Sequence, residues 1–291
     1  MKVHHLNCAT FCPRGGRIFG GAGRWFETAK LVCHCLLLET ESGLVLVDTG
    51  FGTHDIARPL ERLGPAYGLG LFPRLSVQET AYHQLRDLGF SIDDVQHVLL
   101  THLDADHAGG LADFPKARVH LLADEHSAAH SHTARARLRY RSSQWSHGPK
   151  WEFYAPQGER WFGFDCVRRL RDLPPEILFV PLRGHSFGHT AVAVSGSRGW
   201  LLHAGDAYFH HGQLATPDHC PRGLRVLERA LAVDVPALRA NQQRLRDLAQ
   251  ERAKEVSVFC AHDPLELERL QARERARTTN GDPRHPLRAD V

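Results

Sequence analysis

Apolar runs long enough for a β-strand alternate along this chain with longer segments in which apolar positions recur at helical spacing. Residues 31–39 and 44–48, joined by a turn at 41–43, have the pattern of a β-hairpin. Further strands are predicted at residues 97–101, 119–122, 177–181, 191–194, 200–204 and 256–260. Hairpins combined with helical crossovers indicate a mixed fold of the α/β (α+β) class.

Three segments carry helix signals. Residues 76–89 begin with a serine as candidate N-cap and stop at a glycine. A second helix is predicted to start near Asp124. The third covers residues 223–253, and we expect an interruption at Pro236 because proline lacks a backbone N–H.

Three other stretches break the alternation. Residues 52–73 are rich in Gly and Pro and are predicted to be a loop beside the end of the strand at 44–48. Residues 141–164 hold most of the large aromatic side chains, which predicts a lid over a pocket or a contact in a homodimer. Residues 273–291 are charged and aperiodic, which indicates a disordered tail after a single domain at 1–272.

Composition limits the classes of partner. The 291 residues are 42% hydrophobic, an ordinary share for a globular protein with a sizeable core. The 36 basic and 33 acidic residues are mixed and give a formal charge of +3, so neither nucleic acid nor a membrane is predicted as a partner. The alternate arginines of 135–141 would be scattered around a helix, which favours a solvated face. The sequence shows neither a signal peptide nor a transmembrane segment, so we expect a cytoplasmic protein.

The numbers and spacing of histidines and cysteines indicate a metal site whose ligands include histidine but not a cysteine pair. The chain has 21 histidines, whereas its seven cysteines are an odd set without a C-x-x-C pair. Cys33 and Cys35 lie in the apolar run 31–38, where strand alternation places both on one face. We interpret them as small buried side chains in a sheet.

Candidate metal ligands concentrate directly after the strand predicted at 97–101. They are His102, Asp104, Asp106 and His107. Small residues at 105 and 108–110 let the backbone turn sharply around them. Two carboxylates this close would repel each other unless a cation neutralised them. The cluster therefore favours a metal over a helix N-cap with solvated carboxylates.

Three further donors occupy similar places in the sequence. His185, Asp206 and His262 each follow an apolar strand within a few residues. Loops after strands gather at one rim of a sheet, where they commonly carry functional side chains. We therefore expect these three side chains to join the cluster at 102–107.

These segments resemble the metallo-β-lactamase superfamily, whose pattern is H-x-H-x-D-H followed by a His, an Asp and a last His, each in a loop after a strand. The matching motifs are His102-x-Asp104-x-Asp106-His107, Gly184-His185, Gly205-Asp206 and Ala261-His262, with Asp48-Thr49-Gly50 at an early strand end. The resemblance covers about residues 30–263. It implies a four-layer αβ/βα sandwich with metals at one edge.

The resemblance also implies two divalent metal ions per chain. One would be held by His102, Asp104 and His185, the other by Asp106, His107 and His262, with Asp206 bridging them. The family usually has His where this chain has Asp104, and the hard oxygen donor shifts that site toward Mn or Fe, with Zn still the first choice. Asp48 and His189 are expected to orient ligands rather than to bind metal.

Such a pair of ions would generate a bridging hydroxide as nucleophile, with Asp106 as a candidate catalytic group that orients water or passes a proton. The amino-acid sequence of residues 102–110 is similar to that of lactonases that open N-acyl homoserine lactones. This resemblance implies a small-molecule lactone substrate. That branch carries a Tyr at the position of Phe209. Tyr208 is a candidate catalytic residue, although its hydroxyl would point the other way on an extended backbone.

Several alternatives stay open at this stage. Thioester, β-lactam and phosphotriester hydrolases would use the same metals, and iron-based oxidation occurs in the same superfamily. The alternative outside enzymes is a non-catalytic metal-binding protein. Seven donors with a bridge favour two open metal positions over a closed structural site.

Overall fold

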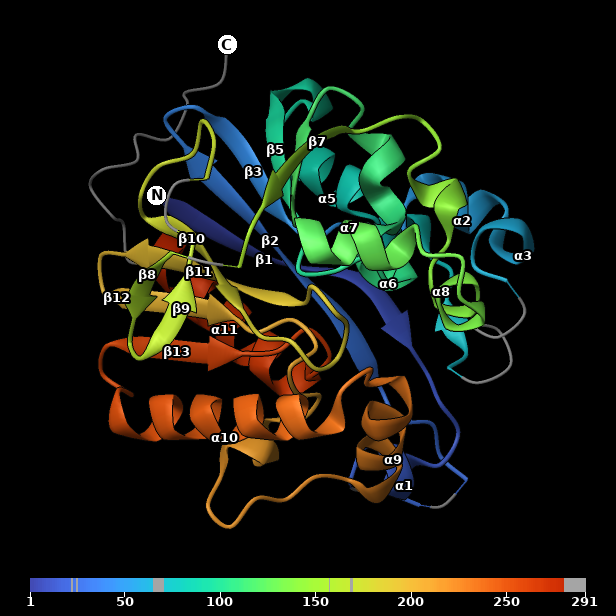
Figure 1. Cartoon of the computed structure of the whole chain (residues 1–291), viewed down its shortest axis with the longest axis vertical. Coiled ribbons are helices and arrows are strands. Elements are labelled where there is room, and N and C mark those ends of the chain that lie inside the picture. The colour runs from blue at the N-terminus through green and yellow to red at the C-terminus, as the bar shows by residue number, and fades with distance from the viewer. Residues whose placement is uncertain (22, 25, 65–70, 157, 168–169, 280–291) are drawn as a thin grey trace.

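The computed structural model describes residues 1–21, 23–24, 26–64, 71–156, 158–167 and 170–279. In that part of the chain, two β-sheets pack face to face (Figure 1). The larger sheet has seven strands in the order β4-β1-β2-β3-β5-β6-β7. These strands are β1 (Lys2–Phe11), β2 (Leu31–Thr40), β3 (Gly43–Val47), β4 (Pro73–Arg74), β5 (Val95–Leu99), β6 (Arg118–Leu122) and β7 (Lys150–Tyr154).

The smaller sheet has four strands among the described residues, in the order β10-β11-β12-β13. They are β10 (Ile177–Pro181), β11 (Thr190–Gly196), β12 (Gly199–His203) and β13 (Val256–Phe259). Strands β10, β12 and β13 run in the same direction, because β11 is antiparallel to both of its neighbours and β13 is parallel to β12. A separate hairpin of β8 (Glu159–Trp161) and β9 (Phe164–Cys166) contacts β10.

Helices lie outside the two sheets and at their ends. They are α1 (Gly16–Phe19), α2 (Thr53–Ala57), α3 (Pro59–Arg62), α5 (Ala81–Asp87), α6 (Ala105–Ala108), α7 (Ala123–Ala129), α8 (Ala134–Arg139), α9 (Arg222–Leu231), α10 (Val235–Glu251) and α11 (Pro264–Thr279). The helix predicted at 76–89 begins late, because Thr80 caps α5 after a short 3₁₀ turn. The predicted interruption near Pro236 is confirmed, and Pro236 lies in the first turn of α10, where its missing N–H leaves no helical bond unmade.

Strand alternation builds the layers. In β2, Leu36 and Leu38 face the smaller sheet and join the same core cluster as Phe179. Leu37 points to the opposite face, into a cluster that includes Leu85 of α5. The outer face of the smaller sheet is covered by α10. The order helix, sheet, sheet, helix confirms the αβ/βα sandwich.

All of the predicted strands are present, with their ends shifted by two residues at most. Strand β1 did not stand out in the apolar pattern because it carries polar residues that are nonetheless buried, among them His4, His5 and Thr10. The prediction of a loop at 52–73 is wrong for its first part. Helices α2 and α3 form there, and 65–70 lie outside the described residues.

Three of the seven aromatic side chains of 141–164 are buried in the core. Trp145 belongs to the cluster between the larger sheet and its helices, whereas Trp161 and Phe164 pack in the cluster beside α10. All three are 7% exposed or less. The prediction of a lid is therefore wrong for these three side chains, since this segment supplies core packing through β7, β8 and β9.

Helix α11 continues to Thr279, so the prediction of disorder is wrong for 273–279, while 280–291 lie outside the described residues. Glu274 fixes this helix to β1. Its carboxylate lies 2.7 Å from Nδ1 of His4 and accepts the backbone N–H of His5 at 3.1 Å. The second nitrogen of His4 lies 2.8 Å from Glu39. Such specific pairs hold a charged segment whose composition alone suggests disorder.

Replacing His4 is expected to change how stability depends on pH. Burial lowers the pKa of His4, but the carboxylates of Glu274 and Glu39 together raise it by more. The net pKa of His4 is therefore above its usual value. The stabilisation is therefore full below about pH 6.5 and is lost as pH rises through the higher folded pKa. We expect His4→Gln to cost about 1 kcal/mol near pH 6 and less at alkaline pH. Urea unfolding of both proteins at several pH values measures this, and parallel pH profiles would contradict it.

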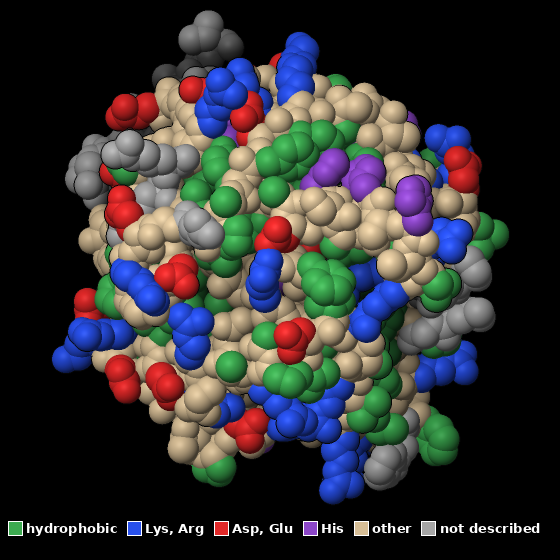
Figure 2. Space-filling view, in the orientation of Figure 1, with side chains coloured by type: hydrophobic (Ala, Val, Ile, Leu, Met, Phe, Trp, Pro, Cys, Tyr) green, Lys and Arg blue, Asp and Glu red, His purple; other side chains and the backbone are tan. Residues whose placement is uncertain are grey.

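Charges of both signs are interspersed on the face seen in Figure 2. Exposed ion pairs, such as the 2.7 Å pair of Lys116 with Asp93, neutralise charge locally. Within the described ranges, no helix combines the length and apolar character needed to cross a bilayer.

Candidate metal centre

The candidate ligands come from loops that follow four strands. His102 follows β5, His185 follows β10, Asp206 follows β12 and His262 follows β13. The last three strands are parallel to one another, so their carboxyl ends open onto one edge of the smaller sheet. The structure thus brings together the donors that the sequence places after separate strands.

The first group of donors surrounds one oxygen of Asp206. Oδ2 of Asp206 lies 3.3 Å from Nε2 of His185 and 3.8 Å from Nε2 of His102. Asp104 completes this group, with its Oδ2 3.1 Å from His185 and 3.3 Å from His102. Ligand atoms of His102, Asp104 and His185 all lie within 4.8 Å of one another, so this group could hold a metal ion.

The second group lies around the other oxygen of the same carboxylate. Oδ1 of Asp206 is 3.2 Å from Nε2 of His107 and 3.1 Å from Nε2 of His262. Oδ2 of Asp106 approaches the same two imidazoles at 3.8 and 3.7 Å. Asp206 therefore stands between two sets of donors.

The burial of the seven predicted ligands and the hydrogen-bond partners that some of their polar atoms lack are consistent with bound cations. The exposed fractions of all seven predicted ligands are 7% or less. Among the described residues, none forms a hydrogen bond with the buried atoms Nε2 of His102, Nε2 of His107 or Oδ1 of Asp206. A buried polar atom without a partner costs about 1–3 kcal/mol, and several of them around clustered carboxylates are satisfied together by metal ions.

The pKa values show how strongly these groups interact. Burial raises the pKa of Asp206, but His262, His107 and His185 hold it well below its usual range. Burial lowers the pKa of His107, whereas Asp206, Asp48 and Asp106 raise it well above normal. Burial and the nearby Arg139 guanidinium lower the pKa of His185 to about 4, so its imidazole is neutral, as a ligand must be.

Hydrogen bonds to Nδ1 direct Nε2 of His102, His107 and His262 into the cluster, whereas Nδ1 of His185 has no hydrogen-bond partner among the described residues. Asp48 lies 2.8 Å from Nδ1 of His107, which confirms the orienting role predicted for this carboxylate. Nδ1 of His262 donates to the carbonyl of Val32 at 2.8 Å. His189 is not aimed at a metal, since its Nε2 accepts the backbone N–H of Asp206 at 2.9 Å, in line with the predicted supporting role.

Replacing Asp48 tests this orientation. Asp48 also accepts the backbone N–H and the hydroxyl of Thr101, each at 2.8 Å, so it connects β3 to the ligand loop. We expect Asp48→Asn to weaken metal binding by about 10–100-fold, because the amide holds the His107 ring less firmly in its binding tautomer. Competition with a chromophoric chelator measures the affinity. Equal affinities in the two proteins would contradict the orienting role.

Arg139 corrects the interpretation of the arginine run. Its Nε and Nη2 donate to the two oxygens of Asp104 at 2.6 and 2.7 Å. Its Nη1 donates to the carbonyls of His185 and Leu231. The guanidinium is buried in the site rather than solvated, because the end of α8 turns this one arginine inward. Burial raises the pKa of Asp104, but the Arg139 guanidinium opposes this effect most strongly. The net pKa of Asp104 is well below its usual range.

Glu125 is a second residue that sequence reasoning missed. Its fully buried carboxylate accepts from the backbone N–H groups of Leu103 and Gly188 and from the hydroxyls of Tyr140 and Ser186. It thereby fixes two ligand loops relative to each other. The acidic residues at the start of α7 are also typical of an ordinary helix N-terminus, so the sequence carried no distinct signal.

Tyr208 and Phe209, in the loop after β12, point in opposite directions, in agreement with the direction predicted for the Tyr208 hydroxyl. The Tyr208 hydroxyl donates to Glu266 at 3.0 Å, and the ring is fully buried in the core beside α10. The Phe209 ring instead packs edge-on against His262 and His185, at 5.0 and 6.0 Å between centroids. The catalytic role considered for Tyr208 is thus unsupported, and Phe209 forms an apolar wall of the site.

Two facing sheets with outer helices carry, at the strand ends, a buried cluster of His and Asp side chains that could hold metal ions. Residues 29–262 match the family described as the metallo-beta-lactamase superfamily. The chain belongs to that superfamily.

Sequence relatives agree with this assignment. A probable metallo-hydrolase of Mycobacterium tuberculosis, Rv2300c, is 43% identical over 265 residues, which cover 91% of this chain and 81% of that protein. An N-acyl homoserine lactonase of Bacillus cereus is 30% identical over 168 residues, which cover 58% of this chain and 60% of the lactonase.

Solved structures share the fold. A B. thuringiensis AiiA mutant with N-decanoyl-L-homoserine bound at its active site has a TM-score of 0.68 and 19% identity, covering 92% of this chain and 95% of that one. AidC, a dizinc quorum-quenching lactonase, has a TM-score of 0.60 and 18% identity, covering 90% and 87%.

Proposed function

We propose that this chain hydrolyses cyclic esters of the N-acyl homoserine lactone type at a pair of divalent metal ions. One ion would be bound by His102, Asp104 and His185, the other by Asp106, His107 and His262, with Asp206 shared. The observation that carries the proposal is the position of Asp206 between the two donor groups: its Oδ1 faces His107 and its Oδ2 faces His185, while Nε2 of His262 lies within 3.2 Å of both oxygens. A carboxylate in this position is suited to bridge two cations.

Zinc is the first choice for these ions, because imidazole and carboxylate donors suit it well. Bound there, two such ions would lower the pKa of water toward neutrality and polarise the ester carbonyl. Asp106 would hold the proton released by the attacking water and return it to the ring oxygen that leaves the carbonyl. Phe209 would exclude bulk water from the His185 and His262 side of the site.

Exposed apolar side chains on three segments near the site suit a substrate with an acyl chain. Arg139 on α8 hydrogen-bonds to the carbonyls of His185 and Leu231 and so gathers three segments beside the site. Each segment carries an exposed large apolar side chain, namely Leu138, Phe187 or Leu231, and Leu138 is 77% exposed. Exposed apolar side chains grouped beside a polar site are typical of ligand-binding surfaces. The relatives named as N-acyl homoserine lactonases support the same substrate class.

Hydrolysis of a substrate panel by zinc-loaded protein tests the proposal. The panel holds N-acyl homoserine lactones with short and long acyl chains, a thioester, a β-lactam and a phosphotriester. We expect ring-opened N-acyl homoserine as the major product, with activity lost on chelation and restored by zinc. Turnover of another class with no lactone opening would contradict the lactonase assignment but leave the metal pair, whereas activity that survives complete metal removal would contradict both.

A further inference from the structure

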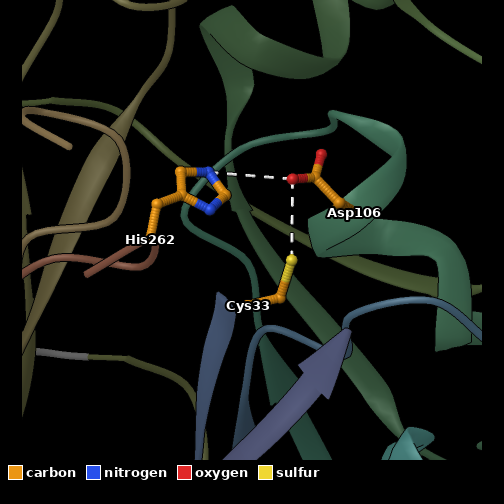
Figure 3. A group of neighbouring side chains, drawn as sticks. All are labelled: Cys33, Asp106 and His262. Atoms are coloured by element: carbon orange, nitrogen blue, oxygen red, sulfur yellow. Dashed lines mark hydrogen bonds and ion pairs between the residues drawn. The ribbon is translucent and has the colours of Figure 1, made fainter. Parts of the chain in front are cut away.

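One thiol lies against the second group of donors. Sγ of Cys33, on β2, is 3.7 Å from Oδ2 of Asp106, and the ligand atoms of Cys33, Asp106 and His262 lie within 4.8 Å of one another (Figure 3). The exposed fraction of Cys33 is 1%. Figure 3 shows the three side chains, which come from β2, from α6 and from the loop after β13, pointing toward one another. This thiol was interpreted from the sequence as simple core packing.

We propose that Cys33 is a ligand of the second metal ion, together with Asp106, His107 and His262. This inference rests on the metal pair of the proposed function and adds a sulfur donor to it. With Asp206 as a fifth donor this ion would be five-coordinate, and zinc bonds of about 2.3 Å to sulfur and about 2.0 Å to oxygen would put two neighbouring donors roughly 3.0–3.5 Å apart. The distance of 3.7 Å between Sγ of Cys33 and the Asp106 oxygen is close to the upper end of this range.

The backbone on either side of Cys33 is tied to the His262 loop. The N–H of His34 donates to the carbonyl of Ala261 at 2.9 Å, and Nδ1 of His262 donates to the carbonyl of Val32 at 2.8 Å. The N–H of Cys33 donates to the side chain of Asn7 at 3.2 Å. Sulfur and imidazole are therefore held at a fixed separation, as preorganised ligands must be.

Unpartnered atoms in the same place indicate a cation. Nε2 of His107, 3.8 Å from the Asp106 oxygen, and Oδ1 of Asp206, 3.1 Å from Nε2 of His262, are buried and have no hydrogen-bond partner in the part of the chain that the structure describes. Metal binding would break the S–H bond of Cys33, form a sulfur–metal bond and release one proton to solvent. A thiolate makes the second position softer than the first, where Asp104 supplies a hard oxygen, so the two positions would prefer different metals.

X-ray absorption at the zinc edge tests the assignment directly. We expect a sulfur scatterer about 2.3 Å from zinc in the wild-type chain. Cys33→Ser should remove that scatterer, weaken binding of one ion by at least about 10-fold and release one proton fewer per chain on zinc addition. Cys35→Ser is the matched control, because Cys35 lies on the same face of β2, is equally buried and belongs to the core cluster on the outer side of the larger sheet.

The outcomes separate this inference from the proposed function. Two zinc ions per chain with only nitrogen and oxygen neighbours would overturn the Cys33 assignment and leave the metal pair intact. A sulfur signal that persists in Cys33→Ser would also overturn it, because another cysteine would then be the source. A wild-type chain that binds no zinc would overturn the proposed function and this inference with it. The wild-type spectrum decides the matter even if a variant fails to fold.

Discussion

Asparagine in place of Asp206 is expected to lower hydrolytic turnover by about 10³-fold or more and to reduce the metal content of the protein. The amide carries no charge and has one oxygen, whereas the two oxygens of Asp206 each face a pair of imidazoles. Among the groups that raise the pKa values of His107 and His262, Asp206 has the strongest effect. Steady-state kinetics and elemental analysis of Asp206→Asn measure both effects.

A buried carboxylate outside the cluster provides the control. Asp113 is 9% exposed and accepts hydrogen bonds from Thr53, away from the metal ligands. Asp113→Asn should keep metal content and turnover close to wild type, even if it lowers stability. Unchanged turnover in Asp206→Asn would contradict the bimetallic assignment.

Loss of Arg139 is expected to destabilise the metal-free protein strongly and the zinc-loaded protein less. Without its guanidinium, the Asp104 carboxylate would remain buried and lose the donor that both of its oxygens accept from, keeping only the imidazoles of His185 and His102 nearby. Breaking a buried pair in this way costs about 3–5 kcal/mol. If Asp104 is also a metal ligand, a bound ion takes over part of the charge compensation. Arg139→Met should therefore show a larger stabilisation by zinc than the wild-type chain.

Denaturant unfolding with chelator and with saturating zinc measures the two losses. Arg137→Met is the matched control, because Arg137 lies on the same helix with an exposed side chain and should change stability by no more than about 0.5 kcal/mol. An equal loss for Arg139→Met with and without zinc would show that Asp104 does not contribute to metal binding.

The metal-ligand cluster was predictable because its signals are local. His185, Asp206 and His262 each stand a few residues after an apolar strand, and parallel strands bring such positions to one edge. Continuous apolar runs of strand length likewise predicted β2, β3 and the smaller sheet. Strand β1 was missed because its buried histidines are satisfied by partners from distant segments, which an apolar pattern does not register.

The residues that contact the ligands or their loops do so through long-range contacts, so the local sequence around them gave no signal of their role. Arg139 sits in a run whose spacing indicates a solvated helix, and only the end of α8 beside Asp104 makes it buried. Glu125 resembles any acidic residue in a first helical turn. Cys33 fits a buried strand, and its neighbour Asp106 is distant in sequence. For each of these, the partner lies on another element, so one sequence cannot supply the pairing.

Elemental analysis of the wild-type protein, purified without added metal, tests the central claim most directly. Two sets of donors that share Asp206 predict close to two divalent ions per folded chain, with zinc as the main element. A folded chain that retains no metal, and takes up none when zinc is supplied, would contradict the metal centre and the hydrolysis proposed for it.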